Sequence, residues 1–488
     1  MTATRTNPVV EAYRAALPAG DVGEMDISPV DRTGVPVVST DFAGSQWRAA
    51  ACGYGWEHEQ ARIGGYGELA EALLLRRELR GRIPRTASYA ELRAERGASG
   101  VADPLTLVLP AGSDYGPDRP LHWLTAVRWR TGDEVLVPSE FCASETPDLP
   151  APPPGDPLIT VVTNGSGAGD TAARAVAHGL LELLQRDGNA VCYRAMDQGL
   201  ELELDDVRDS VNRALLARFA DVGIEVLPKL ASTQFGLTNL YVVGADSDDR
   251  HPTAPPIALT ACGEAVHPDR EVALRKALLE YASSRARKLF AHGPLEAVRP
   301  FAPQEYWERE MAHPVAPQET RALEMMREWS ELSAAELRAL LEPTVLARCS
   351  STAFSTLPTV APGALDEPEA LLADLLDRLA DFDVLVVLAP APTAVTAKVI
   401  VPGLEVETMS YGRIGERGVA KLLAAGSPLV GIGPPPHPGA PPVPLTDDAR
   451  ERLGGRAWLD VAAVRDVVGE LYPLYREPDR HALARSTA

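Results

Sequence analysis

The sequence lacks the features by which several large protein classes are recognised. No apolar run reaches the roughly 18 residues that a membrane-spanning helix needs, and the N-terminus MTATRTNPVVEAYR has no secretory signal pattern. Clusters of lysine and arginine are also missing, because 47 basic residues stand against 68 acidic ones for a net charge of −21. Phosphate backbones and anionic lipids are bound by clustered cations. We therefore expect a cytoplasmic protein that binds neither nucleic acid nor membranes.

Cysteine is scarce, and its spacing excludes two further classes. The five cysteines lie at least 50 residues apart, and none belongs to a CxxC pair: Cys52, Cys142, Cys192, Cys262 and Cys349. Zinc-binding knuckles and disulfide frameworks both require closer, repeated spacings. We expect free thiols, most of them buried.

The composition is that of a folded globular protein. Apolar residues make up 45% and charged residues 24% of 488 residues, enough for one large domain or several smaller ones. Strand patterns alternate with helix patterns, which predicts an α+β or α/β fold. We expect strands over 158–164, 256–263, 383–390 and 397–404, and helices over 57–80, 171–186, 269–290 and 320–342. Of the 43 prolines, many gather in 146–157, 249–256, 358–368 and 433–444, which indicates loops.

Three of the predicted helices carry charged or polar side chains on one face. Residues three or four apart share a face of a helix, and the sets are Glu68 with Glu71, Glu182 with Gln185 and Arg186, and Lys276 with Glu280. Most such sets lie on a solvated surface. Glu182 differs because leucines flank it on both sides, and a buried carboxylate is costly without a cation. Carboxylates brought together from separate helices suit Mg²⁺ held against nucleotide phosphates.

The glycine-rich turn at 164–170, NGSGAGD, belongs to neither of two common nucleotide motifs. It lacks the third glycine of a dinucleotide-binding turn and the lysine of a P-loop. Asp170 precedes the helix, so we interpret it as the helix N-cap. Glycine amides at a helix N-terminus also form a good phosphate cradle. His178, one turn before Glu182, is interpreted as a packed core histidine.

Together these segments resemble the motifs of the YcaO family. The first resembles a GKG-type turn followed by a helix with ExxE, here Gly53-Tyr54-Gly55 with Glu68 and Glu71. The second is TNGSGAGDT with GLLELLQRD, and the third is GEAVHPDREVALRKALLEYASSR. Weaker echoes are LHWLTAVRWRTGDEVLVPSEF at 121–141 and VIVPGLE at 399–405. The matches follow the order of the family over roughly residues 45–420.

The resemblance implies a fold, a reaction and a set of partners. YcaO proteins use ATP and Mg²⁺ to activate a backbone amide oxygen, most often in ribosomally made peptides. The implied architecture is an α+β YcaO-like fold of mixed sheets flanked by helices around a central nucleotide pocket. We expect an N-terminal segment (1–45), a YcaO-like domain (46–425), and a Pro-rich stretch with a helical C-terminal extension (426–488). A homodimer is also implied.

The resemblance assigns roles residue by residue. The metal ligands would be Glu68, Glu71, Glu182 and Gln185. The nucleotide would be bound by Gly53, Tyr54, Gly55, Asn164, Asp170, Arg174, Arg186, Lys276 and Glu280. Glu182 and Arg186 would also carry catalysis.

Five of these positions depart from the family pattern. Tyr54 stands for a lysine, Asp170 for an asparagine, Arg174 for a glutamate, Gln185 for a glutamate and Lys276 for an arginine. The site is therefore either retuned or degenerate. The first alternative is an ATP-dependent enzyme, and the second is a catalytically inactive subunit that binds a peptide or a partner enzyme without using ATP.

The product stays open at this point. A cysteine, serine or threonine side chain as nucleophile gives an azoline, sulfide gives a thioamide, and an amine gives an amidine. Azoline-forming relatives often end in a Pro-rich C-terminus that reaches the active site. Here the Pro-rich stretch lies at 433–444 and the chain ends in HALARSTA, which weakens the azoline assignment. The expected partners are a ribosomal precursor peptide and a separate leader-binding or sulfur-delivery protein.

Overall fold

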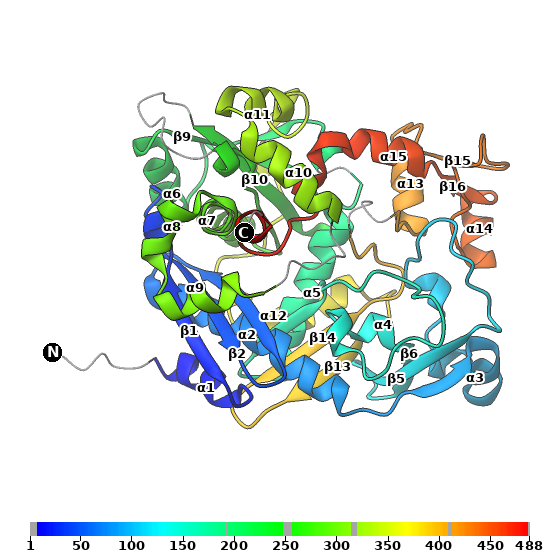
Figure 1. The fold of residues 1–488 in the computed structure, drawn as a ribbon. Coiled ribbons are helices and arrows are strands. Elements are labelled where there is room, and N and C mark those ends of the chain that lie inside the picture. The colour runs from blue at the N-terminus through cyan, green and yellow to red at the C-terminus, as the bar shows by residue number, and fades with distance from the viewer. Residues whose placement is uncertain (1–6, 192–193, 247–255, 314–319, 408–411, 487–488) are drawn as a thin grey trace.

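The structure is a computed structural model that describes residues 7–191, 194–246, 256–313, 320–407 and 412–486. Helices and several separate sheets are mixed, which confirms the predicted α+β class. Figure 1 shows the C-terminal end of the chain near the middle of the view and the N-terminal helix α1 (Pro8–Ala16) at the lower edge of the molecule.

The first sheet contains the N-terminal segment. It joins β1 (Asp21–Asp26), β2 (Val37–Ala43) and β3 (Arg48–Tyr54) in antiparallel order. Strand β2 pairs with β3 along its whole length, from Val37 opposite Tyr54 to Ala43 opposite Arg48. The domain boundary predicted at 45/46 therefore falls inside one sheet.

Two larger sheets and one small sheet complete the strands. The six-stranded sheet has the order β4-β5-β13-β14-β7, with β6 beside β5: β4 (Arg85–Ser88), β5 (Pro120–Arg128), β6 (Glu134–Pro138), β7 (Ser166–Gly169), β13 (Leu385–Pro390), β14 (Val395–Ile400). The five-stranded sheet has the order β11-β10-β9-β8-β12: β8 (Leu200–Glu203), β9 (Ile224–Ser232), β10 (Thr238–Asp246), β11 (Gly263–His267), β12 (Ser350–Ala353). The small sheet pairs β15 (Val430–Ile432) with β16 (Ala457–Leu459).

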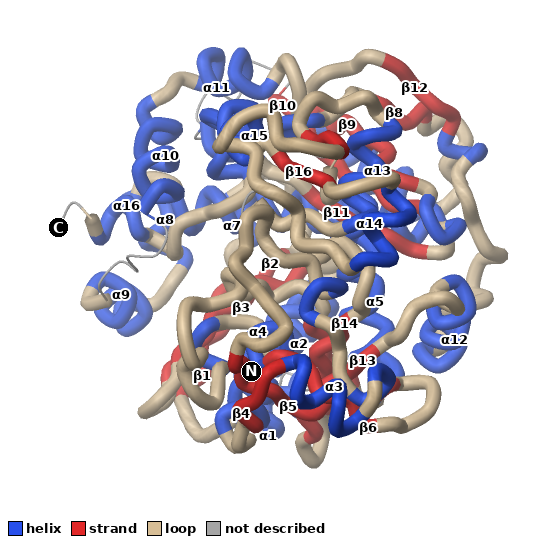
Figure 2. Tube along the Cα trace, turned by 90° about the vertical axis from the view of Figure 1, so that its right-hand side faces the viewer, coloured by secondary structure: helices blue, strands red, loops and turns tan. Residues whose placement is uncertain are grey.

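Three long helices each follow a strand and pack against it. Helix α2 (His58–Arg80) packs on β3, α5 (Ala172–Asn189) on β7, and α7 (Arg270–His292) on β11. Figures 1 and 2 show the three-stranded and six-stranded sheets in the lower half of the molecule and the five-stranded sheet in the upper half, with α5 between them. The three helices thus meet where the halves join.

The remaining helices cover the outside of the sheets. They are α1 (Pro8–Ala16), α3 (Tyr89–Arg96), α4 (Ser139–Cys142), α6 (Ser210–Asp221), α8 (Leu295–Val298), α9 (Gln304–Met311), α10 (Thr320–Glu331), α11 (Ala334–Leu341), α12 (Pro368–Arg378), α13 (Glu416–Ala424), α14 (Asp447–Leu453), α15 (Val461–Val468) and α16 (Ala482–Arg485). In the described residues, no helix combines the length and the apolar character needed to cross a membrane.

The close packing of strand on helix depends on three glycines. A side-chain carbon at Gly53 in β3 would collide with the carbonyl oxygen of Ala61 in α2. A side-chain carbon at Gly167 in β7 would likewise collide with the carbonyl oxygen of Ala175 in α5, and one at Gly263 in β11 with that of Ala277 in α7. Glycine is required here because two backbones approach each other more closely than any side chain allows.

Two predicted strands are placed wrongly. Residues 158–164 form no strand, and the strand of this region is β7, which lies on the glycine-rich turn instead. Small residues are needed at this sheet edge because α5 lies directly against it. Leu158 and Ile159 are buried, but they do not pair with any strand. Residues 256–260 form a 3₁₀ turn, and β11 begins at Gly263.

The helix predicted over 320–342 is two helices. Helix α10 ends at Glu331, and Ser333 then caps α11 in a capping box with Glu336. A serine that caps the following helix competes with continuation of the preceding one. The strands predicted over 383–390 and 397–404, and the helices predicted over 57–80, 171–186 and 269–290, are present with shifts of a few residues.

The cysteines behave as expected of free thiols. Cys52 and Cys142 are buried, Cys262 is half-buried and Cys349 is exposed, and none of these four described cysteines is in a disulfide. Cys192 lies outside the described residues.

The glycine contacts generate a test of this packing. Gly167→Ala is expected to lower the free energy of unfolding by about 1–3 kcal/mol, because the added methyl meets a helix carbonyl. Gly116→Ala is the matched control, since nothing lies within 4 Å of a side-chain carbon at that position. Urea unfolding of both variants measures the difference. Equal stability of Gly167→Ala and wild type would contradict the close approach.

Candidate functional site

A cavity of about 390 Å³ lies between α2, α5 and α7. Eight of the residues predicted for the site line it: Tyr54, Glu68, Glu71, Glu182, Gln185, Arg186, Lys276 and Glu280. They come from all three sequence motifs, and the first and last of them, Tyr54 and Glu280, lie 226 residues apart along the chain. A volume of this size is within the usual range for small-molecule sites.

The three carboxylates Glu68, Glu71 and Glu182 share this cavity. The backbone N–H of Cys52 donates to Glu68 at 3.2 Å, and that of Gly165 donates to Glu182 at 2.9 Å. Burial, followed by the charges of Glu68 and Glu182, raises the pKa of Glu71 well above its usual value. Burial also raises the pKa of Glu68. The carboxylates repel one another, and a bound cation would relieve that repulsion.

The residues fit Mg²⁺ as part of a nucleotide complex rather than as a bare ion. Among the described residues, no group of three or more His, Cys, Asp or Glu side chains is assembled closely enough to hold a metal alone. Mg²⁺ usually keeps several waters and takes only one or two carboxylates besides phosphate oxygens. Two of the three carboxylates Glu68, Glu71 and Glu182 around one cavity would meet that requirement.

Glu264 on β11 fixes the polar face of α5. Its Oε2 accepts hydrogen bonds from Gln185 at 2.9 Å, Arg186 at 2.7 Å and Asn189 at 2.9 Å. Arg186 also donates to Asn164 Oδ1 at 3.2 Å. The guanidinium is therefore held in one orientation at the cavity wall, 3.5 Å from Glu182.

Two basic groups of the cavity have few partners. No hydrogen bond or ion pair joins Lys276 to a described residue, although the charge of Glu280 acts on it. His178 was interpreted as a core histidine, and this is wrong: its side chain is 54% exposed and faces the cavity, with Nδ1 3.5 Å from Glu71. Surrounding protein and the charge of Lys276 lower the pKa of His178 to about 4. The imidazole is neutral at physiological pH. Lys276, whose pKa is lowered by burial, is thus a basic group of this wall without a hydrogen-bond or ion-pair partner among the described residues.

Tyr54 occupies the place of the family lysine and has its own partner. Its hydroxyl donates to Glu280 Oε2 at 3.3 Å across the cavity wall. Burial, followed by the charge of Glu264, raises the pKa of Glu280 to about 7. The pair is thus neutral or singly charged near neutral pH.

Five residues predicted to bind the nucleotide do not line the cavity: Gly53, Gly55, Asn164, Asp170 and Arg174. Gly53 packs against α2, and Asn164 bonds Arg186 and the carbonyl of Val406. Asp170 and Arg174 pair with each other at 2.7 Å on the surface. Asp170 is also not the helix N-cap, because Thr171 accepts the N–H of Arg174.

Several residues that line the cavity were not among the predicted site residues. Arg287 lies eleven residues after Lys276 on α7, so helical periodicity places it on the same face of the helix. Arg285, the last residue of the third motif, is instead buried and forms an ion pair with Asp31. Glu264, Arg76 and Asp148 carry no such signal. Arg76 reaches Asp148 at 2.7 Å and also pairs with Glu145, 69 residues away in sequence.

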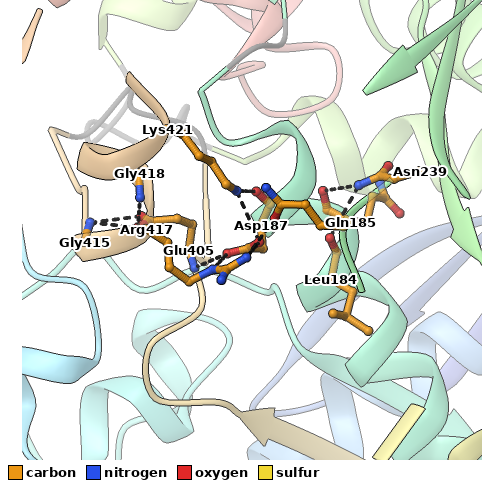
Figure 3. A network of polar contacts seen from close by, with 10 residues as sticks. Leu184, Gln185, Asp187, Asn239, Glu405, Gly415, Arg417, Gly418 and Lys421 are labelled. Atoms are coloured by element: carbon orange, nitrogen blue, oxygen red, sulfur yellow. Dashed lines mark hydrogen bonds and ion pairs between the residues drawn. The ribbon is translucent and has the colours of Figure 1, made fainter. Parts of the chain in front are cut away.

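The C-terminal end of α5 is anchored by a buried acid. Asp187 is fully buried and forms ion pairs with Arg417 at 2.7 Å and Lys421 at 3.2 Å (Figure 3). Its Oδ1 also accepts a hydrogen bond from the backbone N–H of Glu405 at 3.0 Å. The Glu405 carboxylate in turn accepts the N–H groups of Gly415 and Gly418. The network ties α13 to the turn of α5 that carries Gln185 and Arg186.

A second cavity of about 280 Å³ shares a wall with the first. Tyr54, Glu68, Glu280 and Arg287 line both. Its far side is formed by the C-terminal segment, where Glu477 pairs with Lys288 at 2.6 Å and Arg480 donates to the carbonyl of Ala51 at 3.0 Å. The segment around Glu477 and Arg480 therefore reaches the cavity that shares a wall with the first one.

The raised pKa of Glu280 generates a test. Unfolded glutamate has a pKa of about 4.3, so the folded protein binds this proton more tightly, and its stability falls as pH rises from there to about 7. Glu280→Gln removes this loss. We expect the variant to exceed wild type in free energy of unfolding by about 1–3 kcal/mol at about pH 8, and to match it near pH 4.

Urea unfolding without nucleotide measures this difference. Glu296→Gln, at an exposed position of α8, is the control and should follow the wild-type curve. A gap between Glu280→Gln and wild type that does not change with pH would refute a raised pKa.

Comparison of the sequence with family models gives one match. The model described as YcaO cyclodehydratase, ATP- and Mg²⁺-binding, matches residues 52–405, well over half of the chain. An uncharacterised protein of Methanothermobacter thermautotrophicus is 27% identical over 274 residues, 56% of this chain and 66% of that protein. An uncharacterised protein of Mycobacterium tuberculosis is 26% identical over 270 residues, 55% and 57% respectively. The alignments thus span under two thirds of these relatives.

Solved structures share the fold. YcaO from Methanopyrus kandleri bound with AMPPCP and Mg²⁺ has a TM-score of 0.54 and 20% identity, covering 83% of this chain and 91% of that one. A heterocyclase in complex with substrate and cofactor has a TM-score of 0.60 and 14% identity, covering 86% and 54%. The predicted cofactors, ATP and Mg²⁺, are those of the matched family. With three motifs around one cavity and a family model matched over residues 52–405, this chain belongs to the YcaO family.

Proposed function

We propose that this chain uses Mg·ATP to phosphorylate a backbone amide oxygen of a ribosomally made peptide. One observation carries the proposal: Glu68, Glu71 and Glu182 share a cavity with the unpaired cation Lys276. A magnesium nucleotide presents a divalent cation beside phosphate oxygens, so an acidic wall next to a free ammonium complements it. The family description supports the same cofactors.

The residues present suit distinct parts of such a complex. Glu68, Glu71 and Glu182 would hold Mg²⁺, and Lys276 and Arg186 would contact phosphate oxygens. Lysine acts as a point charge and lacks the two-pronged fork of the family arginine. Gln185 donates its amide to Glu264, which leaves its carbonyl oxygen as the atom for a metal.

Bound ATP would supply the phosphoryl group that turns an amide oxygen into a leaving group. The share of this chain is positioning and charge neutralisation, in which Glu182 would act through the metal and Arg186 on the phosphate oxygens. The product depends on the attacking group: a peptide side chain gives an azoline, sulfide a thioamide, and an amine an amidine. The heterocyclase with a similar fold supports ring closure as one of these outcomes.

The proposal also includes partners. The substrate is a ribosomal precursor peptide, and a separate protein binds its leader or delivers sulfur. A homodimer in the cytoplasm is the proposed state of the protein. The net charge of −21 favours a basic leader over an acidic one.

A specific observation favours a second candidate, a catalytically inactive subunit that binds a peptide or partner without ATP. Tyr54 and Gln185 replace two charged family residues, and each is tied to a glutamate of the chain, Glu280 and Glu264. Such bonds stabilise the site without a ligand.

Thermal unfolding with Mg·ATP distinguishes the two candidates. At about a hundred times its dissociation constant, a bound ligand stabilises a protein by about 2.7 kcal/mol. We expect such a shift in wild type and its loss in Glu182→Gln, together with phosphate release in the presence of the precursor peptide. No shift and no phosphate release would favour the inactive subunit. Mass spectrometry of the peptide then separates loss of water from exchange of oxygen for sulfur.

Lys276 offers a sharper test of the phosphate contact. Lys276→Met is expected to weaken Mg·ATP binding by about 10- to 100-fold, because a charged hydrogen bond is lost. Lys276→Arg should retain binding. Arg174→Met is the matched control, since Arg174 lies outside the cavity, and its affinity should stay within about twofold of wild type. Titration calorimetry with Mg·ATP measures all three, and a loss in Arg174→Met equal to that in Lys276→Met would refute the assignment.

A further inference from the structure

Lysine is rare in this chain, and one of its five lysines has an unusual environment. Lys229, Lys288 and Lys421 form ion pairs with carboxylates, and Lys276 faces the cavity. Lys398, on β14, is 3% exposed, and no ion pair joins it to a described residue. A buried lysine without a carboxylate partner is costly when charged.

The ammonium of Lys398 contacts three oxygens instead. Its Nζ lies 3.3 Å from Ser144 Oγ, 2.8 Å from the carbonyl of Val162 and 3.2 Å from that of Thr163. Ser144 Oγ lies 2.7 Å from Ser166 Oγ. Both serines line the first cavity, whereas Lys398 lies behind them. The three side chains therefore form a continuous hydrogen-bonded chain from the cavity into the interior.

This arrangement satisfies both protonation states of the lysine. A charged Lys398 donates its three N–H groups to Ser144 and the two carbonyls, and Ser166 donates to Thr163 at 2.8 Å. A neutral amine keeps two donors for the carbonyls and offers its lone pair to the hydroxyl of Ser144. The chain of hydroxyls then reverses direction, because Ser144 donates to the amine and Ser166 donates to Ser144 instead of to the carbonyl of Thr163, which leaves the Ser166 oxygen free to accept a hydrogen bond from the cavity.

The surroundings bring the two states close in energy. Burial lowers the pKa of Lys398 to about 8. The charges of Glu182 on α5 and Asp148 oppose this effect, Cys142 on α4 adds to them, and Arg413 acts in the same direction as burial. Lys398 also acts on Glu71 of α2. A fraction of the lysine is accordingly neutral near physiological pH.

We propose that Ser166, Ser144 and Lys398 form a proton relay that opens on the cavity and accepts the proton of the attacking group. This inference rests on the proposed function. The proton of the attacking thiol, hydroxyl, amine or hydrosulfide passes to Ser166 Oγ as its bond to the carbonyl carbon forms. The proton of Ser166 passes to Ser144, and that of Ser144 to the neutral Lys398, which becomes an ammonium. No electron leaves or enters.

The position of the relay agrees with this role. Ser166 directly follows Gly165, whose N–H holds Glu182, and it pairs with Lys398 in the ladder between β7 and β14. The relay therefore opens beside one of the carboxylates proposed to hold the metal. Ser166 is the group that meets the attacking atom, and Lys398 is a positioning residue that acts through it.

The first test measures the lysine directly and needs no substrate. Nuclear magnetic resonance of the full chain with isotope-labelled lysine follows five side chains, and Lys398→Arg identifies the Lys398 signal by removing it. The relay requires that the Lys398 side chain titrates with a pKa near 8. A pKa of Lys398 at the ordinary lysine value of about 10.4 would overturn the relay.

The second test measures phosphate release from Mg·ATP with water as the attacking group. In wild type the rate should rise with pH around a midpoint near 8. Lys398→Arg, which stays charged and therefore cannot accept a proton, and Ser166→Ala should lose that rise and about 100-fold in rate. Ser350→Ala, an exposed serine of β12, is the control.

The outcomes separate the two proposals. Absence of a thermal shift with Mg·ATP in wild type refutes the proposed function. A normal thermal shift, together with an unchanged pH profile of phosphate release in Lys398→Arg or Ser166→Ala, refutes the relay and leaves the proposed function standing. Unfolding curves of Ser166→Ala, the smaller change, separate loss of the relay from loss of the fold.

Discussion

The contact of three strands with three helices at glycine is the constraint on which the site depends. Gly53, Gly167 and Gly263 let the backbones of β3, β7 and β11 touch the helices that follow them. Each helix carries one set of site residues, so the distance between the helix and its neighbouring strand determines the position of those side chains in the cavity. A larger residue at any of the three positions would push one wall of the cavity outward, because protein interiors are close-packed.

The cavity formed in this way concentrates like charges in a partly buried space. Burial and mutual repulsion raise the pKa values of Glu68 and Glu71, and burial with the charge of Glu264 raises that of Glu280. Such crowding persists because other contacts hold the elements in place. Glu264 fixes one face of α5 and Asp187 fixes its C-terminal end (Figure 3). A divalent cation with phosphates is the ligand that this charge pattern complements.

The departures from the family pattern are explained by new partners within the chain. Asp170 and Arg174 form an ion pair on the surface, so these two substitutions account for each other. Tyr54 bonds Glu280 and Gln185 bonds Glu264, while Lys276 keeps a free charge in the cavity. With these contacts in place, Glu68, Glu71 and Glu182 still line one cavity.

Local patterns in the sequence were enough to identify the three helices, the α+β class and seven of the cavity residues, because helical spacing is a property of neighbours along the chain. The eighth, Tyr54, was assigned only by the resemblance to the first motif of the family. The same patterns misplaced β7, since an apolar run at 158–164 looks more like a strand than SGAG does. Tertiary structure alone decided that Glu264, Arg76, Lys398 and the C-terminal Glu477 join the site. Each of these contacts links residues about 60 or more positions apart, and no local spacing records which distant segments will pack together.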